Sequence, residues 1–239
     1  MKHFINIKDV PYKTLRKILS DTKKRKDLRK KLKTLEIDKD NPLKGILLIQ
    51  MFEKSSLRTR LSFYLAIRQL GGSALTLRPD ELHLSKGGES LSDTAKILST
   101  YGDIFVLRTD NEKKLNSFQK FLSIPLINGL SPNSHPAQIL SDIFTIEEIT
   151  KKNISRLNIC WIGDSNNVLN SLIEASIKFS FKLNIGCPKN YNPPSEMQRM
   201  ISQKSSKIKI FNNPKVAIKN ADVVLTDKVI SMNDKVNKK

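Results

Sequence analysis

The sequence predicts an α/β protein with two domains, each built on a parallel sheet. Two observations support this. Short apolar runs of strand length alternate with stretches of helical period along most of the chain, which is typical of parallel sheets covered on both faces. The chain has 239 residues, and two domains are favoured because most domains have about 100 to 150 residues.

The first domain is expected to cover residues 1–150. A helix should run from the N-terminus to Lys33, and the pair Gly71-Gly72 should end a second helix. A long helix at 135–151, preceded by a loop at 129–134, should bridge the two domains. The other elements expected here are strands at 45–52, 74–77, 104–107 and 124–128 and helices at 59–70 and 92–100.

The second domain is expected to cover residues 151–239 and to resemble one half of a Rossmann fold. Its expected elements are strands at 157–162, 182–186, 207–211 and 222–226 and helices at 168–179 and 195–202. Because the alternation is still under way at Lys239, the sequence predicts two Rossmann-like domains of which the second is incomplete.

Composition favours a globular protein that acts on a small anion. Hydrophobic residues make up 38% and charged residues 27% of the chain, and the net charge is +19. Such a charge would suit nucleic-acid binding, but the lysines fall on amphipathic stretches with few aromatic residues and no nucleic-acid motif. We therefore expect a solvated basic surface, which favours an anionic substrate, and no nucleic-acid partner.

Cysteine usage and the N-terminus both favour the cytoplasm. Cys160 and Cys187 lie in apolar runs without a second ligand at a usable spacing, so core thiols are expected in place of a metal pair or a disulfide. Residues 1–17 have no signal-peptide pattern, and no run approaches the roughly 20 apolar residues of a membrane span. The sequence predicts a cytoplasmic protein without membrane contact.

The first chemical motif lies at residues 52–60, Phe-Glu-Lys-Ser-Ser-Leu-Arg-Thr-Arg, between an expected strand and an expected helix. Hydroxyls, guanidinium groups and unpaired amides at a helix N-terminus form an anion site, because the donors and the helix dipole both point at the ligand. The alternative is an ordinary N-cap by Ser55 or Ser56 with two surface arginines.

Two further clusters follow expected strands. Arg108-Thr109 lies at the carboxyl edge of the first sheet, where ligands of α/β proteins bind, although Arg108 could instead be a salt-bridged surface residue. His135 and Gln138 begin the bridging helix and could bind a carbonyl oxygen and an amide nitrogen. A lone histidine at a helix start is more often a cap or a surface residue.

Taken together, these residues resemble the transcarbamoylase family. The family's Ser-Thr-Arg-Thr-Arg signature followed by Ser-Phe corresponds to residues 56–63, Ser-Leu-Arg-Thr-Arg-Leu-Ser-Phe. Its His-Pro-x-Gln element corresponds to residues 135–138, with Leu140 and Asp142 in the expected frame. The order and spacing agree over nearly the whole chain.

The second domain resembles the branch of the family that uses ornithine. Residues 163–168, Gly-Asp-Ser-Asn-Asn-Val, are similar to its Gly-Asp-x-Asn-Asn turn, and residues 227–232 are similar to its Asp-x-x-x-Ser-Met element. Ornithine carries an α-carboxylate and an α-ammonium, which an amide and a carboxylate can bind; Asn167 and Asp227 supply these groups. Without the resemblance, residues 164–167 would be an ordinary N-cap turn.

The resemblance implies a role for each matching residue. Arg108, His135 and Gln138 would be catalytic, polarising the carbamoyl oxygen and binding its nitrogen. It implies no metal and no organic cofactor, and a homotrimer with shared active sites in which the loop at 82–90 reaches a neighbour. The implied carbamoyl phosphate ligands are Ser56, Leu57, Arg58, Thr59, Arg108, His135 and Gln138, and the implied ornithine ligands are Asn167, Asp227, Ser231 and Met232.

Two departures from the family keep other hypotheses open. Leu57 replaces the usual Thr, and Ser-Leu-Arg-Thr-Arg is also similar to carbamoyltransferases that act on N-acetyl- or N-succinylornithine. The sequence ends at Lys239, before the family's His-Cys-Leu-Pro segment and closing helix. We therefore expect a fragment, and a catalytically inactive chain that only binds carbamoyl phosphate is the alternative to an enzyme.

Overall fold

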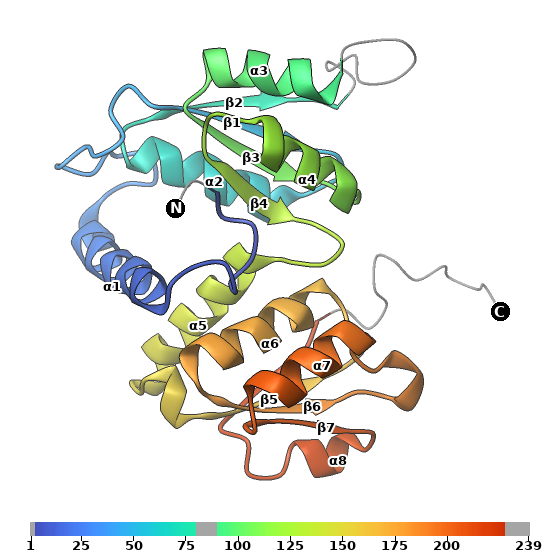
Figure 1. The fold of residues 1–239 in the computed structure, drawn as a ribbon. Helices are drawn as coiled ribbons and strands as arrows, with labels where there is room; N and C mark the ends of the chain where they lie inside the picture. The colour runs from blue at the N-terminus through green and yellow to red at the C-terminus, as the bar shows by residue number, and fades with distance from the viewer. Residues whose placement is uncertain (1–2, 80–89, 228–239) are drawn as a thin grey trace. The chain divides into compact units, whose positions relative to one another are not determined.

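The computed structural model describes residues 3–79 and 90–227 of the chain. It divides into two compact units, Met1–Ala137 and Gln138–Lys239. Each unit contains a four-stranded parallel sheet with helices (Figure 1), so the predicted α/β class with two parallel sheets is confirmed. The division falls in the first turn of α5 (Pro136–Thr150), the predicted bridging helix.

The sheet of the first unit has the strand order β2-β1-β3-β4, and all its strands are parallel. The N-terminal segment adds to its β4 edge, because Phe4 N donates to Leu126 O at 2.7 Å and Phe4 O accepts from Asn128 N at 2.9 Å. The strands are β1 (Leu47–Phe52), β2 (Ser73–Leu77), β3 (Ile104–Arg108) and β4 (Leu126–Leu130).

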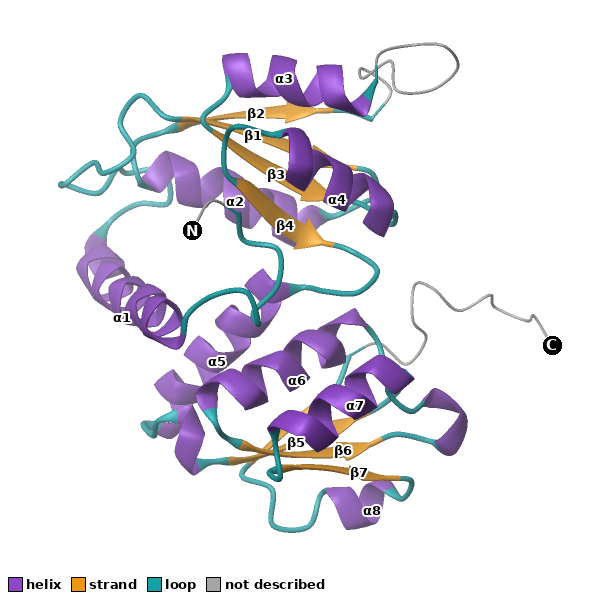
Figure 2. Ribbon diagram, viewed as in Figure 1, coloured by secondary structure: helices purple, strands orange, loops and turns teal. Residues whose placement is uncertain are grey.

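Helices cover both faces of this sheet (Figure 2). Alternate residues of β1 pack against helices on opposite faces of the sheet. Ile49 and Met51 pack with α3 (Leu91–Tyr101) and α4 (Glu112–Phe121) on one face. Leu48 packs with Ile67 of α2 (Leu57–Gln69) on the other. The period of two in a strand sends successive side chains to opposite faces. The carboxyl ends of the parallel strands therefore meet at one edge.

Three predicted elements of this unit need correction. The first helix is shorter than expected, because α1 covers Tyr12–Leu28 and a 3-10 turn (Arg29–Lys31) follows it. Strand β4 continues through Gly129 and Leu130, which were expected in the loop. Helix α4 was not predicted, although the side chains of Leu115 and Phe118 are fully buried.

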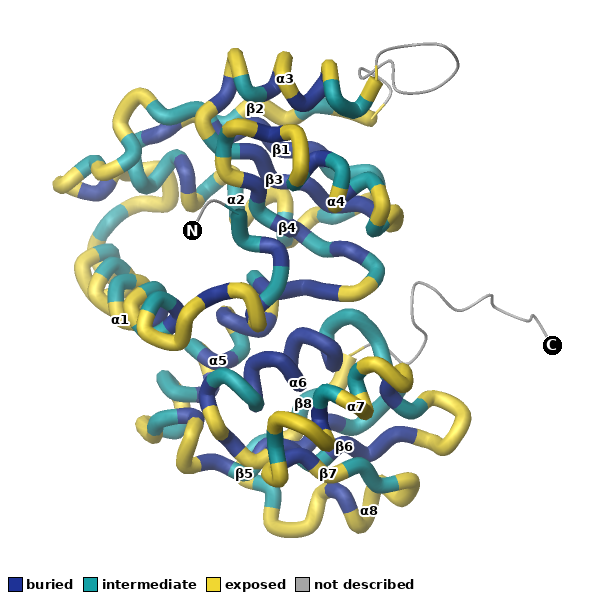
Figure 3. Tube along the Cα trace, in the orientation of Figure 1, coloured by how far each residue is buried: buried dark blue, intermediate teal, exposed yellow. Residues whose placement is uncertain are grey.

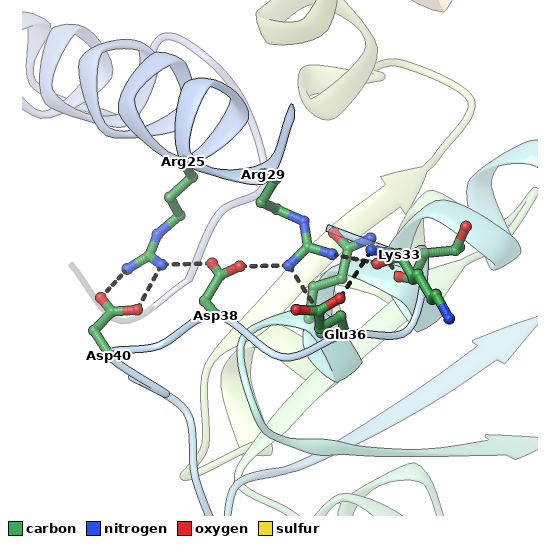
Figure 4. Close-up of polar contacts among 8 residues, drawn as sticks. Arg25, Arg29, Lys33, Glu36, Asp38 and Asp40 are labelled. Atoms are coloured by element: carbon green, nitrogen blue, oxygen red, sulfur yellow. Dashed lines mark hydrogen bonds and ion pairs between the residues drawn. The ribbon is translucent and has the colours of Figure 1, made fainter. Parts of the chain in front are cut away.

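A network of ion pairs ties α1 to the segment that leads into the sheet (Figure 4). Asp38, whose side chain is 9% exposed, accepts from Arg25 at 2.7 Å and also pairs with Arg29. Arg25 continues to Asp40 at 2.9 Å; its hydrogen bonds to the two carboxylates raise its pKa. Asp38 also donates its N–H to Gln69 O at 2.8 Å, which links the network to the end of α2.

The second unit has the strand order β7-β6-β5-β8, again parallel. Helices α6 and α7 cover one face of the sheet, and the short α8, which was not predicted, covers the other (Figure 1). Its strands are β5 (Asn158–Ile162), β6 (Lys182–Gly186), β7 (Ile208–Phe211) and β8 (Val223–Leu225), and its helices are α6 (Asn167–Phe179), α7 (Ser195–Lys204) and α8 (Pro214–Ala217).

The core of the second unit contains both cysteines as free thiols, as predicted. Burial raises the pKa of Cys160, and it raises the pKa of Cys187 to about 11. Figure 3 shows the central strands and most of α6 buried, with α7 and α8 more exposed. Within residues 3–79 and 90–227, none of the helices has both the length and the apolar character needed to cross a bilayer.

Candidate active site

The loop between β1 and α2 carries the predicted anion motif. Ser56 occupies the N-cap position of α2, but its side chain does not cap the helix. Its Oγ instead accepts a hydrogen bond at 3.1 Å from Arg108 Nη1, at the end of β3. The first turn of α2 contains no acidic residue, so nothing in that turn neutralises the positive end of the helix dipole.

Arg108 is buried, and this contradicts the alternative of a salt-bridged surface arginine. It is 6% exposed, its Nε is buried without a hydrogen-bond partner, and desolvation lowers its pKa. In the described part of the chain no carboxylate pairs with its guanidinium. A buried cation without a counterion is unfavourable unless a ligand supplies the negative charge.

The register of the sheet brings these two residues together. Phe52 and Arg108 are partners in the β1–β3 pairing, so the turn that follows β1 lies beside the end of β3. Glu53 N donates to Arg108 O at 3.0 Å, and the Glu53 carboxylate binds Thr109 Oγ1 and Lys114 Nζ. The loop is therefore fixed to both β3 and α4.

A second ion pair braces the same loop. Lys54 pairs with Asp110 at 3.0 Å, and this hydrogen bond lowers the pKa of Asp110. An open pocket of about 460 Å³ is lined by residues 52–57, Arg60 and Pro79. The polar loop thus borders a space large enough for a small phosphate-containing ligand.

The other predicted phosphate ligands lie in the first turn of α2. Leu57 and Arg58 are exposed, with Leu57 at 68%, and Thr59 is partly exposed. Neither an acidic partner nor a cap holds the Arg58 side chain in the described structure. The structure therefore brings Ser56 and Arg108 together and leaves Arg58 at the open start of the helix.

His135 follows a tightly bonded loop at the end of β4. Asn128 Nδ2 donates to Ile5 O and to Ser131 Oγ, both at 3.2 Å, and Asn128 Oδ1 accepts from Leu130 N at 3.0 Å. The pairing with β3 is irregular at this point. His135 itself is 7% exposed, so the histidine is neither a surface residue nor part of the helix, which begins at Pro136.

Gln138 and Asp227 belong to the second unit, and each is paired with one further residue. Gln138 Nε2 donates to Asp142 Oδ1 at 2.8 Å, one turn further along α5. Asp227 Oδ2 accepts from Asn166 Nδ2 at 2.9 Å. Asn166 Oδ1 accepts from Val168 N and Leu169 N, both at 3.0 Å, and so caps α6.

The amide bonded to Asp227 is that of Asn166, the N-cap of α6, and the predicted ornithine ligand Asn167 is the first residue of that helix. Sequence reasoning also gave no role to Asp142 or Glu53. The signal for Asp142 was present, because a glutamine and an aspartate four residues apart meet on one face of a helix. Glu53 left no such signal, since its partners are far along the chain.

Part of the predicted site lies outside the described residues. This applies to Ser231 and Met232 and to residues 82–89 of the expected intersubunit loop. Ser90, which ends that loop, caps α3 by accepting from Asp93 N at 3.1 Å. Throughout residues 3–79 and 90–227, no group of three or more His, Cys, Asp or Glu side chains could hold a metal ion.

Comparison with known proteins agrees with these motifs. Residues 2–148 match the carbamoyl-P binding domain of the aspartate/ornithine carbamoyltransferases, and residues 155–239 match the Asp/Orn binding domain of the same group. The chain is 38% identical over 231 residues to an ornithine carbamoyltransferase of Rhizorhabdus wittichii, covering 97% of this chain and 74% of the relative. A Caulobacter vibrioides ornithine carbamoyltransferase is 39% identical over 233 residues, which is 98% of this chain and 74% of that protein.

Solved structures agree as well. The ornithine carbamoyltransferase from Pyrococcus furiosus superposes with a TM-score of 0.89 at 33% identity, covering 98% of this chain and 74% of that one. The anabolic ornithine carbamoyltransferase from Campylobacter jejuni gives a TM-score of 0.84 at 34% identity, with 97% and 75% coverage. Both domain models and the relatives agree, and the chain belongs to the aspartate/ornithine carbamoyltransferase family of transferases.

Proposed function

We propose that this chain transfers a carbamoyl group from carbamoyl phosphate to the side-chain amine of L-ornithine, giving citrulline and phosphate. One observation carries the proposal: the buried, uncompensated guanidinium of Arg108 contacts Ser56 at the acid-free start of α2. A family of carbamoyltransferases needs an anion site of this kind. The relatives named above, which are ornithine carbamoyltransferases, support ornithine as the acceptor.

The phosphate of carbamoyl phosphate is assigned to the loop and the first turn of α2. Its ligands are Ser56, Arg58, Thr59 and Arg108, together with the backbone N–H of Leu57. Backbone amides at a helix start and guanidinium groups both donate to phosphate oxygens, and charge-assisted bonds of this type are about twice as strong as neutral ones. A dianion would also supply the counter-charge that Arg108 lacks.

The carbamoyl end is assigned to the catalytic residues Arg108, His135 and Gln138. Arg108 and His135 donate to the carbamoyl oxygen, and Gln138 accepts from the nitrogen. When the uncharged amine of ornithine attacks the carbamoyl carbon, negative charge develops on that oxygen and is stabilised by these donors. The carbon–oxygen bond to phosphate then breaks, and phosphate leaves with the proton lost by the amine.

The amino-acid end of ornithine is assigned to Asn167, Asp227, Ser231 and Met232. The Asp227 carboxylate is suited to the α-ammonium. It keeps one oxygen beyond the one bonded to Asn166. An amide donor from Asn167 and the backbone of Met232 suit the α-carboxylate.

We also propose the cellular setting that goes with this reaction. The functional division is a carbamoyl phosphate-binding part at 1–150 and an ornithine-binding part at 151–239. The enzyme acts in the cytoplasm, in arginine biosynthesis, as a homotrimer with shared active sites. It needs neither metal nor organic cofactor, and nucleic acid and membrane are not partners.

A second acceptor class, N-acetyl- or N-succinylornithine, is favoured by one observation, the leucine in place of threonine at Leu57. Carbamoylation of ornithine, N-acetylornithine and aspartate by the purified protein separates the two. We expect a large preference for ornithine, because an acylated substrate would leave the Asp227 carboxylate facing an uncharged amide. Similar kcat/KM values for ornithine and N-acetylornithine would favour the second class.

The phosphate assignment has its own test. Arg58→Ala should weaken carbamoyl phosphate binding by about 10- to 100-fold in titration calorimetry, because one charge-assisted contact is lost. The circular dichroism spectrum should not change, since the Arg58 side chain is exposed. Unchanged affinity would remove Arg58 from the site.

A further inference from the structure

The hydrogen bond between Gln138 and Asp142 fixes which end of the Gln138 amide faces outward. A carboxylate accepts hydrogen bonds and has none to donate, so the NH2 end of the glutamine must face Asp142. The distance from Nε2 to Asp142 Oδ1 is 2.8 Å. The carbonyl oxygen of Gln138 then points away from Asp142, and because Gln138 is exposed, this oxygen is open to a ligand.

The surroundings of Asp142 differ from those of an ordinary helix-surface pair. Asp142 is only partly exposed, and burial raises its pKa, while the hydrogen bond from Gln138 opposes this shift. The negative charge of Asp227 also acts on Asp142 and raises its pKa further. A glutamine–aspartate pair that merely supported the helix would be worth a few tenths of a kcal/mol and would not need a desolvated carboxylate.

We propose that Asp142 is a positioning residue that locks the Gln138 amide so that its carbonyl oxygen accepts from the NH2 group of the carbamoyl donor. This inference rests on the proposed function, in which Gln138 binds the carbamoyl nitrogen. If the Gln138 amide were reversed, its NH2 group would face the NH2 group of carbamoyl phosphate, and the hydrogen bond between Gln138 and the carbamoyl nitrogen would be lost. Asp142 therefore determines specificity for a carbamoyl group.

Acetyl phosphate is the matched probe, because it has a methyl group where carbamoyl phosphate has NH2. A fixed carbonyl oxygen on Gln138 favours the binding of carbamoyl phosphate over acetyl phosphate. A Gln138 amide that can adopt both orientations discriminates less strongly between the two ligands. Inorganic phosphate, which lacks both groups, reports on the phosphate ligands alone. The ratio of the affinities for carbamoyl and acetyl phosphate therefore isolates the orientation of Gln138.

The experiment measures calorimetric affinities of the full chain for the three ligands, in the wild type and in Asp142→Leu, Asp142→Asn and Glu148→Gln. Asp142→Leu should lower the affinity for carbamoyl phosphate by about tenfold and leave acetyl phosphate and inorganic phosphate unchanged. Asp142→Asn should give an intermediate ratio of the two affinities. The asparagine can accept from the NH2 group of Gln138 or donate to its carbonyl oxygen, so either orientation of the Gln138 amide forms a hydrogen bond. Glu148→Gln removes the same charge from the same helix and should leave the affinities for all three ligands unchanged.

The outcomes separate this inference from the proposed function. If the wild type prefers carbamoyl phosphate and both Asp142 variants keep the full preference, the positioning role is wrong while the proposed function stands. An equal loss of affinity for all three ligands would also overturn it, because that indicates a structural role. If Asp142→Leu does not fold, Asp142→Asn decides the question alone. A wild type that binds carbamoyl phosphate no better than acetyl phosphate would contradict the proposed function itself.

Discussion

Replacing Arg108 with methionine should stabilise the protein and weaken its binding of carbamoyl phosphate. The arginine is 6% exposed, its guanidinium contacts the uncharged hydroxyl of Ser56, and burial lowers its pKa. Methionine has a similar length and needs no counter-charge. Opposite effects on stability and binding are expected of a charge that is kept for its ligand.

The magnitude follows from the burial and from the single hydrogen bond. Replacing buried ionic groups by apolar side chains of similar volume is often stabilising by about 1 to 4 kcal/mol. Because Arg108 keeps one hydrogen bond and no carboxylate, we expect a gain of about 1 to 3 kcal/mol, which corresponds to a rise in Tm of about 2 to 12 °C for a chain of this size. Loss of one charge-assisted bond to phosphate should weaken binding by about 10- to 150-fold.

The assay is thermal unfolding with and without carbamoyl phosphate. The ligand should raise the Tm of the wild type through preferential binding to the folded state, and the same concentration should raise that of Arg108→Met much less. Arg68→Met is the control, since it removes the same charge from the far end of α2. A variant less stable than the wild type that responds fully to the ligand would refute the reasoning.

Three further predictions concern stability and the acceptor side. Asp38→Ala should lower the free energy of unfolding by about 2 to 3 kcal/mol in urea titrations, because two arginines lose a buried acceptor; Asp40→Ala should have a smaller effect, and equal effects would contradict the network. Asp142→Asn should be more stable than the wild type above the raised pKa of Asp142, where the folded wild type holds an unfavourable charge, and this advantage should disappear at acidic pH. Fluorescence of Trp161, the single tryptophan, reports this transition, and an advantage independent of pH would argue against it. Asn166→Ala should cost about 1 kcal/mol through the lost cap and reduce the affinity for ornithine without changing that for carbamoyl phosphate, as calorimetry can establish.

Much of the fold could be predicted because the apolar runs are local and unambiguous. The stretch at 157–162 is a short apolar run of strand length, which predicts a buried strand, and β5 occupies Asn158–Ile162. Helix α4 was not predicted because the lysines between 113 and 120 indicate an exposed surface segment. Its buried side consists of Leu115 and Phe118, which are three residues apart and too few for a clear period.

The pairings within the site depend on information that is not local. Ser56 and Arg108 are 52 residues apart, and they meet because β3 is the neighbour of β1 in the sheet, an order that composition and periodicity do not specify. The two asparagines at 166 and 167 differ only in their position relative to the start of α6. The phase of that helix gives Asn166 the cap and the bond to Asp227.

The bonds between the N-terminal segment and β4 have a practical consequence for anyone handling this protein. An unpaired outer strand offers a row of free N–H and C=O groups to other chains and invites intermolecular pairing. Phe4 occupies part of that row by bonding to Leu126 and Asn128. Removing the first residues through Ile7 would uncover this outer strand and would also delete a fully buried side chain, that of Ile7. A shortened protein would then be prone to self-association, so an affinity tag is better joined through a flexible spacer ahead of residue 1 than spliced into the first residues.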